Sequence, residues 1–141
     1  MDQVVTQIEL IVGIVLAFGF LWWARRQPDG GSWLYAVGLV VTALIYVGFA
    51  VIGGADARSL GLEALGMLLY CAVAWAGYRR SAAVLALGWA LHILWDVALH
   101  LEGPGAAYTP GWYPWGCVSF DLVVAGAVFV SARPRRDRVS P

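Results

Sequence analysis

Three residues that can bind metals or transfer protons lie four positions apart in the stretch LHILWDVALH. They are His92, Asp96 and His100, and they include both histidines of the chain. On an α-helix, residues at i, i+4 and i+8 turn by only about 40° at each step, so these side chains share one face. The histidines are about 12 Å apart along the axis, too far to share one metal ion. Each can instead chelate an ion together with Asp96, which is the expected centre of the site.

The segments that position these residues are apolar enough to lie in a membrane. The chain is 61% hydrophobic and 13% charged, whereas soluble globular chains are nearer to half apolar. Crossing a hydrocarbon core of about 30 Å takes roughly 20 helical residues. Five segments meet this requirement: 5–24, 33–53, 58–78, 81–101 and 115–132. We therefore predict an all-α fold, one bundle of five transmembrane helices over 1–132, followed by a basic tail at 133–141.

The arginines predict the orientation of this bundle. All nine basic residues are arginines, and eight lie at Arg25–Arg26, at Arg79–Arg80 and in the tail. Five spans place these three groups on one side, which the positive-inside rule assigns to the cytoplasm. We expect a multi-pass protein of the plasma membrane, the inner membrane of a bacterium, with its N-terminus outside. The absence of lysine excludes a retinal or pyridoxal Schiff base and a Walker-type phosphate loop.

Ionisable residues inside the spans gather at one depth. They are Glu9, Glu63, His92, Asp96, His100 and Asp121. A charge at mid-bilayer costs at least about 2.5–3.5 kcal/mol, so each one calls for a partner or a function. In the expected topology, Glu63, Asp96 and Asp121 all come about 7–10 Å below the outer boundary. We predict a polar site in the outer half of the membrane, with His92, Asp96, Glu63 and Asp121 as catalytic residues.

Charge balance narrows the chemistry of this layer. Its four carboxylates have no cation among them, and only Arg58, at the outer edge, lies near. Buried carboxylates without partners must protonate or bind a cation. Carboxylate and imidazole together suit zinc, iron or manganese, which makes His92, Asp96, His100 and Asp121 the candidate metal ligands. A protonated acid–histidine network explains the same residues. As alternatives, Glu9 lies near enough to the surface to snorkel, and Glu63 can pair with Arg58 or cap a helix.

Three tryptophans are candidates for contacts with a substrate. Trp89 and Trp95 lie mid-span, away from both membrane boundaries, where they either pack or line a pocket. Trp112 lies in the connection 102–116, which is rich in Gly, Pro and aromatic residues and is expected to be non-helical. This connection either anchors the chain at the headgroup level or covers the polar site.

The stretch GWALHILWDVALHLEG followed by GCVSFD resembles a bacterial family of small polytopic membrane proteins that is catalogued as a domain of unknown function. The positions that match its pattern are Gly88, Trp89, His92, Trp95, Asp96, His100, Gly116, Cys117 and Asp121. Glu63 also lies in a setting similar to that of a glutamate in the family. The family often has two consecutive histidines, whereas here Leu99 precedes His100. The resemblance covers roughly the last 80 residues and implies membership but no activity.

Three functions remain open. The first is an intramembrane enzyme acting on a lipophilic substrate, in which His92 and Asp96 are metal ligands or a general base with its orienting carboxylate. The second is transport of protons or a metal cation, for which the inner half offers only Thr42, Tyr46, Tyr70 and Cys71 as polar steps. The third is a non-catalytic accessory subunit. The expected partners are the bilayer, a lipophilic small molecule or a cation, and further copies of the chain, with no specific binding of nucleic acid.

Overall fold

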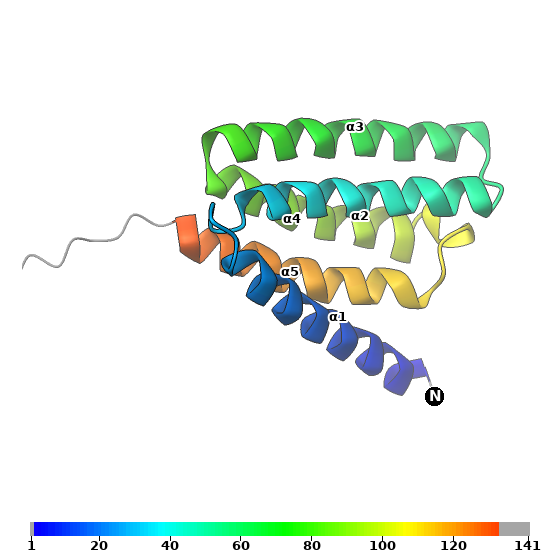
Figure 1. The fold of residues 1–141 in the computed structure, drawn as a ribbon. Helices are drawn as coiled ribbons and strands as arrows, with labels where there is room; N and C mark the ends of the chain where they lie inside the picture. The colour runs from blue at the N-terminus through cyan, green and yellow to red at the C-terminus, as the bar shows by residue number, and fades with distance from the viewer. Residues whose placement is uncertain (1, 133–141) are drawn as a thin grey trace, which may run out of the picture.

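The computed structural model describes residues 2–132, which form five long helices (Figure 1). These are α1 (Asp2–Arg25), α2 (Ser32–Ile52), α3 (Ala57–Arg80), α4 (Ala82–Trp95) and α5 (Trp112–Ala132). A π-helix, η1 (Asp96–Leu101), continues α4, and a short 3₁₀ helix, η2 (Pro104–Ala107), follows it. All five helices, with η1 counted as part of α4, are long and apolar enough to cross a membrane. The all-α class and the five spans are confirmed; the tail at 133–141 lies outside the described residues.

The helices pack so that most chain neighbours are also neighbours in space. α2 packs on α3, α3 on α4 and α4 on α5, and α1 lies along α5 (Figure 1). α1 diverges from α2 and contacts it at few positions. The α1–α2 and α3–α4 connections form one end of the bundle, which we call the arginine end because Arg25, Arg79 and Arg80 lie there. The N-terminus and the other two connections form the opposite, N-terminal end (Figure 1).

Short polar residues begin three of the helices. Asp56 accepts a hydrogen bond from the backbone N–H of Ser59 (2.7 Å) and caps α3, and Ser81 caps α4 in the same way. Asp29 accepts from the N–H of Trp33 in the first turn of α2 (2.9 Å). These side chains satisfy backbone donors that have no partner within the helix. The helices therefore begin where the sequence places its turn residues.

Small residues set the closest helix crossings. A Cβ atom on Gly13 would overlap Ser119 and the carbonyl of Gly116, so α1 and α5 approach each other backbone to backbone. A Cβ atom on Gly66 would lie 2.5 Å from the ring of Trp95, so the α3–α4 contact also depends on a glycine. Close approach through small residues is the usual basis of helix association in membranes. Gly13 fixes where α1 crosses α5 and hence where α1 begins to diverge.

One expected boundary is wrong. The connection 102–116 contains η2, and its last five residues form the first turn of α5, which begins at Trp112 rather than near residue 115. Pro114 is tolerated there because backbone N–H groups in the first turn have no intrahelical acceptor to lose. The helical start turns Tyr113 toward the interior, where it packs on Tyr46 (centroids 5.5 Å apart). Tyr113 therefore contributes to the bundle interior and not only to an anchor at the headgroup level.

The interior has an apolar part and a polar part. At the arginine end the core consists of aliphatic and aromatic side chains, among them Leu39, Leu85, Trp89 and Val124. The buried polar residues of the described chain extend from the middle of the bundle to its N-terminal end. They are Glu63, His92, Asp96, His100, Thr109, Ser119 and Asp121. Five of the six predicted ionisable residues, all except Glu9, are thus buried in this part of the interior.

Candidate functional site

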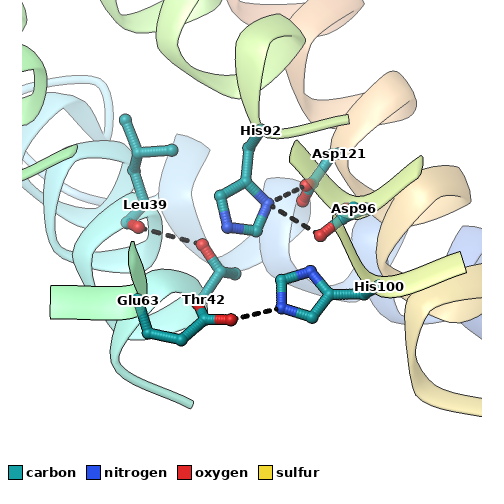
Figure 2. Close-up of polar contacts among 7 residues, drawn as sticks. All are labelled: Leu39, Thr42, Glu63, His92, Asp96, His100 and Asp121. Carbon is teal, nitrogen blue, oxygen red and sulfur yellow. Dashed lines mark hydrogen bonds and ion pairs between the residues drawn. The ribbon is translucent and has the colours of Figure 1, made fainter. Parts of the chain in front are cut away.

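One imidazole and two carboxylates meet at the centre of the bundle (Figure 2). His92 Nδ1 lies 2.7 Å from Asp121 Oδ2, a hydrogen bond between α4 and α5, and 3.5 Å from Asp96 Oδ1. All three side chains are completely buried. Each offers one ligand atom, and these atoms lie within 4.8 Å of one another. His92, Asp96 and Asp121, the central trio below, are therefore close enough to bind one ion together.

A second group lies beside the trio, toward the N-terminal end. His100 Nε2 of η1 is 2.8 Å from Glu63 Oε1 of α3 (Figure 2), and the hydroxyl of Tyr108 donates to the same oxygen over 2.6 Å. His100 and Glu63 are buried, whereas Tyr108 is partly exposed in the connection after η2. Burial, and then the hydrogen bond to Glu63, raise the pKa of Tyr108 above its ordinary value of 10.0. Its hydroxyl therefore remains a donor at neutral pH.

Tyr46 of α2 joins the two groups. Its ring stacks on His100 with centroids 3.6 Å apart and planes inclined by 16°, and its centroid lies 5.9 Å from that of His92. Tyr70 of α3 meets His92 edge to face at 4.9 Å. The two imidazoles are thus held between aromatic rings and hydrogen-bonded carboxylates, an arrangement that fixes their orientation.

Most of the unsatisfied buried polar atoms of the described chain belong to this site. Eight buried side-chain nitrogen or oxygen atoms have no hydrogen-bond partner in the protein. Six of them are Tyr46 Oη, His92 Nε2, both carboxylate oxygens of Asp96, His100 Nδ1 and Asp121 Oδ1. Buried polar atoms are nearly always hydrogen-bonded, because leaving one unpaired costs about 1–3 kcal/mol. Six such atoms in one place indicate that the site is built to hold a ligand.

Apart from the His92 imidazole, which can itself be protonated, no cationic side chain lies near the trio among the described residues. The described arginines lie at the ends of the helices, and Arg58, considered above as a partner of Glu63, is exposed. Glu63 hydrogen-bonds to His100 and Tyr108 instead. Two adjacent carboxylates in a low-dielectric interior cannot both ionise without a nearby cation. One divalent cation would balance the charges of Asp96 and Asp121.

A π-helix begins at Asp96, between the two histidines. His92 and Asp96 share a face as expected, but the chain widens to i→i+5 hydrogen bonding from Asp96 onward, so His100 points to Glu63 on α3 (Figure 2). A Cβ atom on Gly105 would lie 2.6 Å from Cδ2 of His100, so the following connection packs directly on the ring. All three residues are buried, as a shared inward face requires, but His100 pairs with Glu63 rather than with Asp96. Its role as a metal ligand stays a prediction.

A cavity of about 450 Å³ lies between α1 and α5, with Thr42 of α2 on its wall. Trp112, predicted to contact a substrate, lines it, and so does Glu9. Trp89 packs between Phe20 and Phe120, and Trp95 packs on Gly66 and Tyr70. The cavity has the size of a small-molecule site, about 300–1,000 Å³.

The sequence analysis did not assign three tyrosines to the polar site. Tyr46 was assigned to the inner half, yet it lies six residues from the end of α2, about 9 Å deep, as Glu63 lies six residues into α3. The depth arithmetic applied to the acids would have found it. Tyr108 and Tyr113 lie in a segment expected to be an irregular loop, where helical periodicity gives no signal.

Comparisons with known proteins place the chain in a family. A family model described as a family of unknown function, DUF6010, matches residues 6–134. No curated protein and no solved structure matches the chain. The match covers all five helices as well as the polar site, and it agrees with the resemblance seen in the sequence. The chain therefore belongs to DUF6010, a family of unknown function.

Proposed function

We propose that this protein is an intramembrane enzyme that uses a divalent metal ion, zinc, iron or manganese, to act on a lipophilic substrate. The observation that carries the proposal is the set of six unpartnered buried polar atoms around the central trio. A site of this kind, beside a cavity at the lipid-facing surface, suits chemistry on a molecule that dissolves in the bilayer.

The central trio supplies the metal ligands in this proposal. One nitrogen of His92 and one oxygen from each of Asp96 and Asp121 are within the reach of one ion, and mixed imidazole and carboxylate ligands suit these three metals. The two aspartates would neutralise a divalent ion, so the occupied site carries no net charge into the membrane. When bound, the ion would act as a Lewis acid toward an oxygen of the substrate or of water.

The second group supplies acid–base chemistry. Glu63 Oε1 accepts from His100 Nε2, which leaves Nδ1 of a neutral imidazole as a buried acceptor with no partner in the protein. Tyr108 donates to the same oxygen and favours the ionised form of the carboxylate. In this arrangement Glu63 orients His100, and His100 is the general base or acid.

Two features weigh against the other functions. The arginine end is filled with apolar side chains, so a proton or cation that reached the trio would find no polar path onward through one chain. An accessory subunit that uses polar residues only to pair its helices would satisfy them with one another, whereas six buried atoms here are unsatisfied. Both features favour a site that binds and converts a ligand.

The proposal is tested by elemental analysis of the detergent-purified protein. We expect about one equivalent of zinc, iron or manganese per chain in the wild type, lost in Asp96→Asn and retained in Glu9→Gln. Asn is nearly isosteric with Asp, and Glu9 is a matched acid that lies outside the trio. A wild-type protein that binds no metal even after incubation with an excess of each ion would overturn the metal-dependent mechanism.

A further inference from the structure

The cavity beside the site opens toward the lipid. Ile8, Val12 and Leu16 of α1 line it, and each is at least half exposed on the outer surface of the bundle. These three residues span two turns, or about 12 Å along α1. The opening exists because α1 crosses α5 closely at Gly13 and diverges from α2 (Figure 1). A molecule dissolved in the bilayer could therefore enter sideways between α1 and α2.

Tyr113 and Cys117 of α5 form part of the inner wall of the cavity. They lie on the same face of α5 as Asp121, at intervals of four residues. Tyr113 contacts Tyr46, and Tyr46 stacks on His100. Cys117 is a free, buried thiol one turn before Asp121 on α5. Tyr113, Cys117 and their contacts thus lie between a ligand in the cavity and the unpartnered polar atoms.

The charges around the cavity restrict what it accepts. Its lining is almost entirely apolar, and Glu9 is the one ionisable residue of acidic type that lines it among the described residues. No arginine lines it, so an anionic head group would add an unpaired charge beside Glu9 at high cost. A cationic head group would have to leave the aqueous interface and enter an almost entirely apolar cavity, which is also costly. An uncharged head group with a hydroxyl or carbonyl oxygen avoids both penalties.

We propose that this cavity is the substrate site and that its ligand is a neutral, single-chain lipid with one hydroxyl or carbonyl group, entering from the bilayer between α1 and α2. The chain lies between α1 and α5, and the oxygen points past Tyr113 and Cys117 toward the trio. This inference rests on the proposed function for the role of the ligand, but the binding itself does not require a metal.

Photolabelling in phosphatidylcholine nanodiscs tests the inference. The probe is dodecanol carrying a diazirine, and the competitors are unlabelled dodecanol and dodecanoate. We expect saturable labelling of α1 and α5 residues at the cavity, prevented by dodecanol but not by dodecanoate. Val12→Phe, which fills the cavity, should abolish this labelling. Val15→Phe should leave the labelling intact, because Val15 lies three residues further along α1 and is exposed but does not line the cavity.

Several results would overturn the assignment. These are labelling spread evenly over the lipid-facing helices, equal labelling of the two variants, or competition by dodecanoate as effective as that by dodecanol. If Val12→Phe does not fold, Thr42→Leu is used in its place, because it narrows the cavity from the α2 side. Labelling is repeated in a chelator and compared with the elemental analysis above. Saturable labelling of a protein that binds no metal in that analysis would uphold the cavity site and reject the metal-dependent function, and metal binding without labelling would do the reverse.

Discussion

The hydrogen bond from Tyr108 to Glu63 can be measured by a double-mutant cycle. Tyr108→Phe removes only the hydroxyl, and Glu63→Met keeps the length of the side chain but removes the acceptor. The coupling between the two substitutions isolates the interaction energy of the pair, provided that neither single change creates new contacts.

The structure sets the size of this coupling. Hydrogen bonds between helices in a membrane contribute about 0.6 kcal/mol on average and at most about 1.7 kcal/mol. The Tyr108–Glu63 bond is short, at 2.6 Å, and its acceptor is a buried carboxylate, and hydrogen bonds to charged groups are the stronger ones. We therefore expect a coupling of about 1–2 kcal/mol, above the average for membrane helices.

Reversible unfolding in mixed micelles, followed by circular dichroism, gives the four free energies. Tyr78 is the matched control, since it lies fifteen residues beyond Glu63 on α3, about 22 Å away at the arginine end. Tyr78→Phe combined with Glu63→Met should be additive within about 0.3–0.5 kcal/mol. A Tyr108–Glu63 coupling inside that margin would refute the reasoning, because the bond would then contribute no more than a distant pair.

Four further predictions follow from the packing, the titratable groups and the ligands. Gly13→Ala should destabilise the protein, because the added Cβ atom would overlap α5. Gly19→Ala, where the Cβ atom meets open space, should be neutral or stabilise the protein by up to about 1 kcal/mol. The same unfolding assay measures both variants, and equal effects would contradict the packing argument. In a pH series, the contribution of Tyr108 to the free energy of unfolding should be constant below its ordinary pKa near 10. It should be lost as the pH rises toward the higher pKa of the folded state, whereas Tyr108→Phe should show no such loss. The hydrogen bond from the Ser59 backbone N–H lowers the pKa of Asp56. The stabilising contribution of Asp56 as a helix cap should therefore be present above about pH 4 and be lost as the pH falls through the pKa of the folded state. Asp56→Ala should show no such loss. Chelation should lower the melting temperature of the wild type but not of Asp121→Asn; an equal decrease in both would place the metal elsewhere.

Most of the architecture follows from hydropathy and arginine positions alone. In a bilayer the backbone N–H and C=O groups must hydrogen-bond within the protein, so five apolar segments of about 20 residues are expected to form five helices. The depth of Glu63, Asp96 and Asp121 followed from a fixed rise of 1.5 Å per residue. The number of helices depends on the length of segments and not on side-chain contacts, which is why that prediction holds, whereas the depth of these three residues in a membrane stays a prediction.

The pairing within the site could not be predicted in the same way. Regular α-helical geometry paired His100 with Asp96, whereas in the structure His100 lies in a π-helix and pairs with Glu63. No residue in the stretch DVALHL predicts that the helix changes from α to π there. Arg58, the nearest cation in the sequence, was one alternative partner for Glu63, whereas the structure pairs Glu63 with His100 and Tyr108. Contacts across helices depend on crossings set by residues such as Gly13 and Gly66, whose effect appears only in three dimensions.

The uneven filling of the bundle has a consequence for the electrical environment of the site. The apolar core at the arginine end is an insulator, so most of a transmembrane voltage falls across it, whereas the Glu63–His100–Tyr108 group lies toward the N-terminal end, where Tyr108 is partly exposed. Moving one elementary charge through the whole field takes about 2.3 kcal/mol per 100 mV. A proton exchanged through Tyr108 crosses only a small part of that field. Turnover at this site should therefore follow the pH at the N-terminal end of the bundle and be almost indifferent to membrane potential.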